Sequence, residues 1–205
     1  MRHAAALALA LLVGCQVSGP PAPPPPLATA RFATDFHTYR LQRVGLLPLT
    51  GAEISTEQSQ MLQAAFMVEL SHATDVELVR LEPHDLEEVP GSEPYRRGRY
   101  LPRTILELAR RFQLDALLVG TVTHIQAFPP QALSISLDLV SCETGMVLWS
   151  SGVNLDAGDR DVHDSLEAWA AMQRSSTGSR ESLQLTLISP SRFARFAAYE
   201  VARRF

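Results

Sequence analysis

Histidine and acidic side chains are the residues of this chain that could hold a metal ion. The six histidines are His3, His37, His72, His84, His124 and His163. None of them falls into a His-x-x-x-His or His-Glu-x-x-His spacing, which would place two metal ligands on one face of a helix. We therefore predict no zinc site and expect histidines that are solvated or that cap helices.

A group of acidic residues between Asp156 and Glu167 suggests a calcium loop, because hard cations collect carboxylates. With Asp159 in the first position of such a loop, the sixth position is Asp164, where the loop needs glycine, and the twelfth is Ala170. The spacing therefore favours helix capping and a favourable interaction with the helix dipole. Weak cation binding is the alternative.

Catalytic chemistry has little support in the sequence. Cys142 stands at the end of an alternating apolar segment without a positioned histidine, so we predict a buried, inert thiol and assign it no role. A Gly-x-Ser-x-Gly elbow, a glycine-rich phosphate loop and a Gly-x-Gly-x-x-Gly fingerprint are all absent from the sequence. We predict no catalytic residue, no metal and no cofactor. The sequence shows no set of catalytic residues that would support an enzyme acting on cell-wall material.

A short segment rich in arginine and tyrosine has side chains suited to binding. Arginine binds carboxylates and phosphates in a bidentate manner, and tyrosine adds flat contact area, as in the hot spots of protein interfaces. We predict that this segment is a partner-binding surface, with a solvated loop as the alternative. Its residues are Tyr95, Arg96, Arg97, Arg99 and Tyr100.

The overall composition restricts the class of protein. The chain has 205 residues, of which 46% are hydrophobic, and this is enough for one domain with a core. All 18 basic residues are arginines, and the 22 acidic residues leave a net charge of -4. We therefore predict no nucleic-acid partner. No run of 18 or more apolar residues could span a bilayer as a helix.

The first fifteen residues have the layout of a secretion signal. A basic start is followed by an apolar run from Ala4 to Val13 and then by Gly14 and Cys15. Leu12-Val13-Gly14-Cys15 resembles the lipobox of bacterial lipoproteins, which implies cleavage after residue 14 and a covalent lipid on Cys15. An ordinary secretory peptide, with Cys15 incidental, is the alternative.

The residue after this cysteine indicates in which membrane the lipoprotein is located. In enteric lipoproteins an Asp at this position retains the protein in the inner membrane, whereas this chain has Gln16. The resemblance therefore implies an outer-membrane lipoprotein that is anchored by its lipid, with a periplasmic domain.

A proline-rich, uncharged stretch follows and predicts a spacer. Residues 16–30 carry six prolines, and polyproline II geometry of about 3.1 Å per residue would give these fifteen residues a reach of ~45 Å. We predict a lipidated cysteine and linker over 15–35, an α/β domain over 36–174, and a mobile segment with an amphipathic helix over 175–205.

The rest of the chain alternates between strand and helix patterns. Strands are expected at 44–49, 76–79, 116–122, 133–139 and 146–149, and helices at 55–72, 83–89, 104–112, 161–172 and from 191 onward. Residues 90–103 read as a loop, and residues 183–187 fit either a strand or a helix. The order β-α-β-α-β-β-β-α predicts a single mixed-sheet α/β sandwich domain.

Residues 43–154 carry a resemblance to a group of envelope proteins. The strand 44–49, the segment Asp115-Ala116-Leu117-Leu118-Val119-Gly120-Thr121-Val122 and the hairpin around Thr144-Gly145 resemble the group formed by CsgG, LpoB and the amino-terminal domain of TolB. This resemblance implies a non-enzymatic periplasmic domain that binds another protein or oligomerises. The predicted function is therefore partner binding in envelope assembly or maintenance. The alternative is a homo-oligomeric subunit of a secretion or envelope-spanning machine.

Overall fold

The computed structural model describes residues 24–51, 54–87, 95–96, 99–177 and 183–205. Its elements, in chain order, are β1 (Thr29–Phe32), the 3-10 helix η1 (Phe36–Thr38), β2 (Arg43–Leu46), α1 (Thr56–Ala73), β3 (Glu77–Arg80), α2 (Pro83–Glu87), β4 (Tyr95–Arg96), β5 (Arg99–Tyr100), α3 (Pro102–Phe112), β6 (Ala116–Gln126), β7 (Ala132–Ser141), β8 (Val147–Asp156), α4 (Arg160–Thr177), α5 (Leu183–Ile188) and α6 (Pro190–Ala202).

One mixed sheet organises the domain. Its strand order is β1-β8-β7-β6-β2-β3. The pairs β2–β3 and β2–β6 are parallel, and the other neighbours are antiparallel. β2 lies inside the sheet and ends at Leu46, two residues before Pro48, which has no N–H to donate to a neighbouring strand. The predicted mixed-sheet α/β domain is therefore confirmed.

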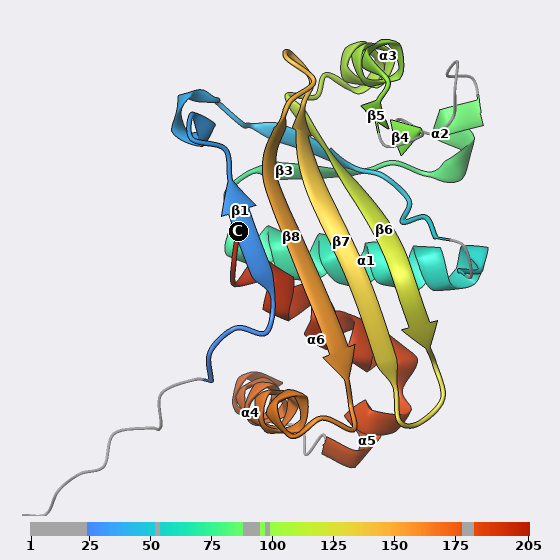
Figure 1. Cartoon of the computed structure of the whole chain (residues 1–205), viewed down its shortest axis with the longest axis vertical. Coiled ribbons are helices and arrows are strands. Elements are labelled where there is room, and N and C mark those ends of the chain that lie inside the picture. Colours follow the sequence, from blue (N-terminus) through green and yellow to red (C-terminus); the bar gives the residue numbers. More distant parts are fainter. Residues whose placement is uncertain (1–23, 52–53, 88–94, 97–98, 178–182) are drawn as a thin grey trace, which may run out of the picture.

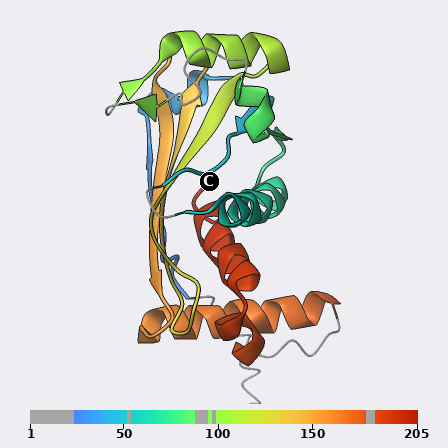
Figure 2. The same cartoon turned by 90° about the vertical axis from the view of Figure 1, so that its right-hand side faces the viewer.

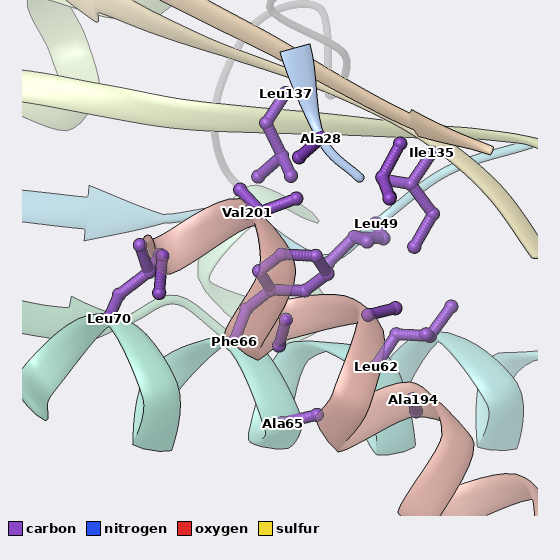
Figure 3. Close-up of a cluster of buried hydrophobic side chains, with 14 of the residues drawn as sticks. Ala28, Leu49, Leu62, Ala65, Phe66, Leu70, Ile135, Leu137, Ala194 and Val201 are labelled. Atoms are coloured by element: carbon purple, nitrogen blue, oxygen red, sulfur yellow. The ribbon is translucent and has the colours of Figure 1, made fainter. Parts of the chain in front are cut away.

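The main core lies between one face of the sheet and the helices α1 and α6, which cover that face (Figures 1 and 2). Phe66 of α1 is fully buried and lies in a cluster with Leu49 and with Val201 of α6 (Figure 3). The facing side of α6 carries small side chains such as Ala194, which let the two helices approach closely. These contacts make α6 part of the core.

A smaller core lies on the opposite face of the sheet, under α3. Leu117 and its cross-strand partner Val140 point to this face, while their neighbours Leu118 and Leu139 belong to the main core. This is the alternation that strands buried on both faces require. Leu108 of α3 packs on this second face and is fully buried. α3 is thereby fixed at one end of the sheet (Figure 2).

Two local features help to define these elements. The Ser55 hydroxyl accepts the N–H of Gln58, and the Gln58 side chain accepts the N–H of Ser55, and this capping box begins α1. Gly145 has φ of 70° in the turn between β7 and β8, a conformation that glycine adopts without steric cost.

Two elements outside the predicted range 36–174 join the sheet and the core. The range 15–35, predicted as a linker, contains β1, which pairs with β8, and Ala28, which is buried. The range 175–205, predicted as a mobile segment followed by a helix, contains α6, which packs into the main core. The folded domain therefore extends beyond 36–174 in both directions, because an edge strand and a core helix complete its sheet and its core.

Two shorter segments are also defined by the structure. Residues 183–187, which fit two patterns, belong to the helix α5. The predicted loop 90–103 contains the two-residue strands β4 and β5 and the first residues of α3. Among the described helices, none has both the length and the hydropathy that a membrane-spanning helix needs.

Candidate functional site

The two ends of the sheet carry the features that could bind something. We call α3, the hairpin β4–β5 and the turn between β7 and β8 the α3 end, which lies at the top of Figures 1 and 2. We call the turn between β6 and β7, α4, α5 and the start of α6 the α5 end, which lies at the bottom of both views.

The predicted arginine and tyrosine segment lies at the α3 end and forms a small hairpin. β4 and β5 are antiparallel, with Tyr95 opposite Tyr100 and Arg96 opposite Arg99. Arg97 lies outside the described residues. α3 follows directly, with Pro102 in its first turn, where the missing N–H has no consequence. The structure therefore brings four of the five predicted residues together beside a helix that is packed on the sheet.

The predicted anchor cannot be placed in the same way. Leu12, Val13, Gly14 and Cys15 lie outside the described residues. The described chain begins at Pro24 and enters the sheet as β1, whose Thr29 pairs with Gly152 in the second half of β8. Because β8 runs toward α4, the chain that precedes β1 leaves the sheet on the side of the α5 end (Figure 1).

Side chains at the end of α6 and just after it hold this entering chain, and they were not among the predicted site residues. Glu200 is fully buried, and its Oε2 accepts the backbone N–H of Leu27 at 2.7 Å. Arg203 donates to the other oxygen of Glu200 at 3.2 Å and to the backbone carbonyl of Pro24 at 2.7 Å. We call Glu200 and Arg203 the latch. A glutamate on the apolar face of the last helix was the available signal, since carboxylates are rarely buried without partners.

An apolar groove opens at the α5 end. It has a volume of about 370 Å³ and lies between α1, the β6–β7 hairpin and the start of α6. Met61, Ile125 and Phe193 line it, and Glu57 is the one titratable side chain among its described lining residues. Beside the groove, Phe128 of the β6–β7 turn is 82% exposed. Ile188 at the end of α5 is 60% exposed.

The acidic cluster builds the connection between β8 and α4. Asp156 Oδ1 accepts the N–H of Gly158 at 2.8 Å, and Asp159 directly precedes the first residue of α4. Asp159 thus lies at the position of the predicted helix cap. Among the described residues, no group of three or more His, Cys, Asp or Glu side chains is arranged to hold a metal ion.

Among the described residues, two groups have clearly shifted pKa values. Burial, assisted by the nearby charge of Asp115, raises the pKa of the Cys142 thiol from 9.0 to about 12. Burial also raises the pKa of Tyr199, against the opposing effect of the Arg203 charge. The Cys142 thiol therefore stays protonated at neutral pH, in keeping with the predicted inert thiol.

No protein-family model matches the sequence, and the search of curated proteins gave no match either. Among solved structures, the chain is similar to a PelC dodecamer from Paraburkholderia phytofirmans, at 12% identity and a TM-score of 0.46, covering 84% of this chain and 96% of that chain. It is also similar to the lipoprotein GNA1162 from Neisseria meningitidis, at 18% identity and a TM-score of 0.44, covering 67% and 99%.

Two proteins of the group named from the sequence are among the matching structures. The LpoB C-terminal domain from Escherichia coli matches at 13% identity and a TM-score of 0.38, covering 55% of this chain and 82% of that chain. TolB from Acinetobacter baumannii matches at 10% identity and a TM-score of 0.35.

Proposed function

We propose that this protein is a lipid-anchored protein of the bacterial envelope whose periplasmic α/β domain binds a protein partner and catalyses no reaction. The anchor is the lipid on Cys15, placed there by the signal segment and by Leu12, Val13 and Gly14. Several acyl chains on one residue hold a protein on a membrane far more firmly than one short chain does. The outer membrane is the proposed address.

The observation that carries the partner-binding proposal is the pairing of the hairpin β4–β5. Its register sets Arg96 opposite Arg99 and Tyr95 opposite Tyr100, so the backbone pairing gathers the arginines and tyrosines of the predicted segment on two short adjacent strands. Arginine binds carboxylates in a bidentate manner, so a protein surface that carries carboxylates is the partner that fits. The hairpin stands at the α3 end, away from the side on which the anchored chain leaves the sheet.

The lipid anchor is tested by intact-mass analysis of the protein purified from envelopes. We expect a chain that begins at Cys15 and carries the mass of a lipid. Cys15→Ser should remain soluble in the periplasm or stay uncleaved. A wild-type chain without lipid would overturn the anchor.

The partner surface is tested by crosslinking the full chain in its native envelope, followed by mass spectrometry. We expect a defined protein to be captured, and to be lost when Arg96, Arg97 and Arg99 are changed to Ser. The matched control changes the exposed Arg31, Arg40 and Arg160 to Ser, which removes the same charge from other surfaces.

In this control the captured partner should be retained. If both variants lose the partner equally, the loss follows from the change in net charge. If both variants still capture the partner, the hairpin is not its binding surface. Either result contradicts the proposed surface.

An oligomeric subunit of an envelope machine is the second proposal, and the edges of the sheet favour it. Within the described part of the chain, β1 and β3 each pair with one neighbouring strand, so each has an outer edge on which a second copy could add a strand. Light scattering separates the two proposals. A monomeric mass supports the adaptor, whereas a closed ring supports the machine.

A further inference from the structure

The α5 end combines exposed apolar side chains with the point from which the anchored chain departs. We propose that the α5 end rests on the membrane surface, with Phe128 and Ile188 inserted among the lipids. This inference rests on the proposed lipid anchor, and it adds an orientation and a second, non-covalent membrane contact.

The latch determines where the tether begins. Leu27 and Pro24 are held through their backbone atoms by Glu200 and Arg203, and α6 is part of the main core. The domain therefore moves as one body up to Pro24. A force on the lipid anchor is therefore transmitted through the latch to α6, and β1 does not bear it alone at the edge of the sheet.

The length of chain outside the latch brings the bilayer within reach of this end. Nine residue steps separate Cys15 from Pro24. At about 3.1 Å per residue for a proline-rich chain, they span about 28 Å. Since the chain leaves β1 on the side of α4 and the β6–β7 turn, the α5 end is the end of the domain that faces the anchored membrane.

The exposed side chains at this end suit a lipid surface. Phe128 is 82% exposed in a tight turn that continues into Pro129 and Pro130, and Ile188 is 60% exposed. Phe128 directly follows Ala127, and Ile188 lies two residues before Pro190. Ala127 and Pro190 both line the apolar groove at the start of α6, so Phe128 and Ile188 lie near this groove. Insertion would remove these apolar surfaces from water, while their backbone stays at the level of the headgroups.

The charge at this end selects the kind of lipid. The exposed charged residues at the connection from β8 into α4 are four aspartates, Asp156, Asp159, Asp161 and Asp164, and one arginine, Arg160, so the connection is negative on balance. Anionic headgroups would repel these carboxylates, so a zwitterionic surface is the one that fits. The proposed occupant is therefore a bilayer rich in neutral lipids.

The experiment uses the full-length lipidated protein in phosphatidylcholine vesicles, with an environment-sensitive dye on a single introduced cysteine. Phe128→Cys reports on the α5 end, and Leu106→Cys, at a 43% exposed position of α3, reports on the α3 end. The native Cys142 is buried and its pKa is raised to about 12, so the dye should not label it.

We expect a blue-shifted emission and quenching by lipid-borne quenchers for the dye at position 128, and a water-like signal for the dye at position 106. Exchange of part of the phosphatidylcholine for phosphatidylglycerol should weaken the quenching at 128. A water-like signal at both positions would overturn the proposal.

A second variant separates insertion by the protein from insertion by the dye. In the chain labelled at position 128, Ile188→Ser should lower the ratio of inserted to free domains by about tenfold, and Leu106→Ser should leave it unchanged. Equal quenching in all three chains would show that the dye alone inserts, and this would also contradict the proposal.

Three further outcomes separate a second protein copy at the α5 end, a missing lipid on Cys15 and a missing membrane contact. If the dye at position 128 is protected in soluble Cys15→Ser protein and its protection grows with concentration, a second copy covers this end and the proposal is wrong. If the protein carries no lipid on Cys15, the proposed function fails. If the lipid is present and position 128 stays in water, only the membrane contact fails.

Discussion

The two ends of the sheet differ in both chemistry and support. The α3 end carries an arginine pair on a two-stranded hairpin beside a helix that rests on the smaller core. The α5 end exposes Phe128 and Ile188, and the chain that precedes β1 leaves the sheet on its side. One sheet thus separates the surface that we propose for a protein partner from the surface that we propose for lipid, and the latch holds the entering chain beside the second.

The largest effect is expected where the core supports both ends at once. Phe66 is fully buried between α1, α6 and strands that run the length of the domain. Phe66→Ala should lower the free energy of unfolding by about 3–5 kcal/mol, because it leaves a cavity in the main core. Chemical denaturation measures this loss, and hydrogen exchange should show both ends opening together. If Phe66→Ala stays stable and hydrogen exchange accelerates at only one end of the sheet, the main core does not support both ends.

A smaller and more local effect is expected under α3. Leu108 is fully buried in the second core, so Leu108→Ala should cost about 2–4 kcal/mol. Hydrogen exchange should accelerate in α3 and leave α6 protected. The control Leu106→Ala, at an exposed position of the same helix, should change stability by no more than about 0.5 kcal/mol. Equal acceleration in α6 would contradict separate support for the two ends.

The latch should give an intermediate effect confined to the entering chain. Glu200→Gln removes the charge that Arg203 contacts and should cost about 1.5–3 kcal/mol, the usual value for a hydrogen bond to a charged group. Limited proteolysis should then cut near Leu27 faster than in wild type. Glu167→Gln, on the exposed face of α4, is the matched control and should not change the cutting. Unchanged cleavage in the Glu200 variant would show that Glu200 and Arg203 do not hold the entering chain in place.

The smallest effect concerns the thiol near the α3 end. Burial raises the pKa of Cys142 from 9.0 to about 12, so above pH 9.0 the unfolded chain loses this proton while the folded chain keeps it. Stability present below pH 9.0 should therefore fall as the pH rises toward 12, by about 1 kcal/mol at pH 10.

The control for this effect is Cys142→Ala, whose stability should lose less over the same pH range. Denaturation at pH 8 and pH 10 measures the difference between the two chains. Identical losses in both chains would contradict a buried thiol.

The elements that the sequence predicted are those whose signals are local. The capping box at Ser55 and Gln58 begins α1, and the alternation in Leu133-Ser134-Ile135-Ser136-Leu137 marks a strand with one buried face. β1 has no such signal, because its four residues are mostly exposed and become a strand only by pairing with β8.

The candidate surfaces were predicted less completely, for a related reason. The arginines of the hairpin are visible as a cluster in the sequence, but the opposition of Arg96 and Arg99 depends on strand register. The latch joins residues more than 170 positions apart, so no local pattern reveals it. Phe128 reads as a residue of a short connection, and only the folded turn shows how far it is exposed.

Site-specific photocrosslinking in the native envelope tests the separation of the two ends most directly. A photoreactive phenylalanine replaces Tyr100 in one chain and Phe128 in another, so that each probe takes the place of an aromatic side chain and the arginines stay, and the adducts are identified by mass spectrometry. We expect a protein adduct from position 100 and a lipid adduct from position 128. A protein adduct from position 128 together with none from position 100 would contradict the assignment of both surfaces.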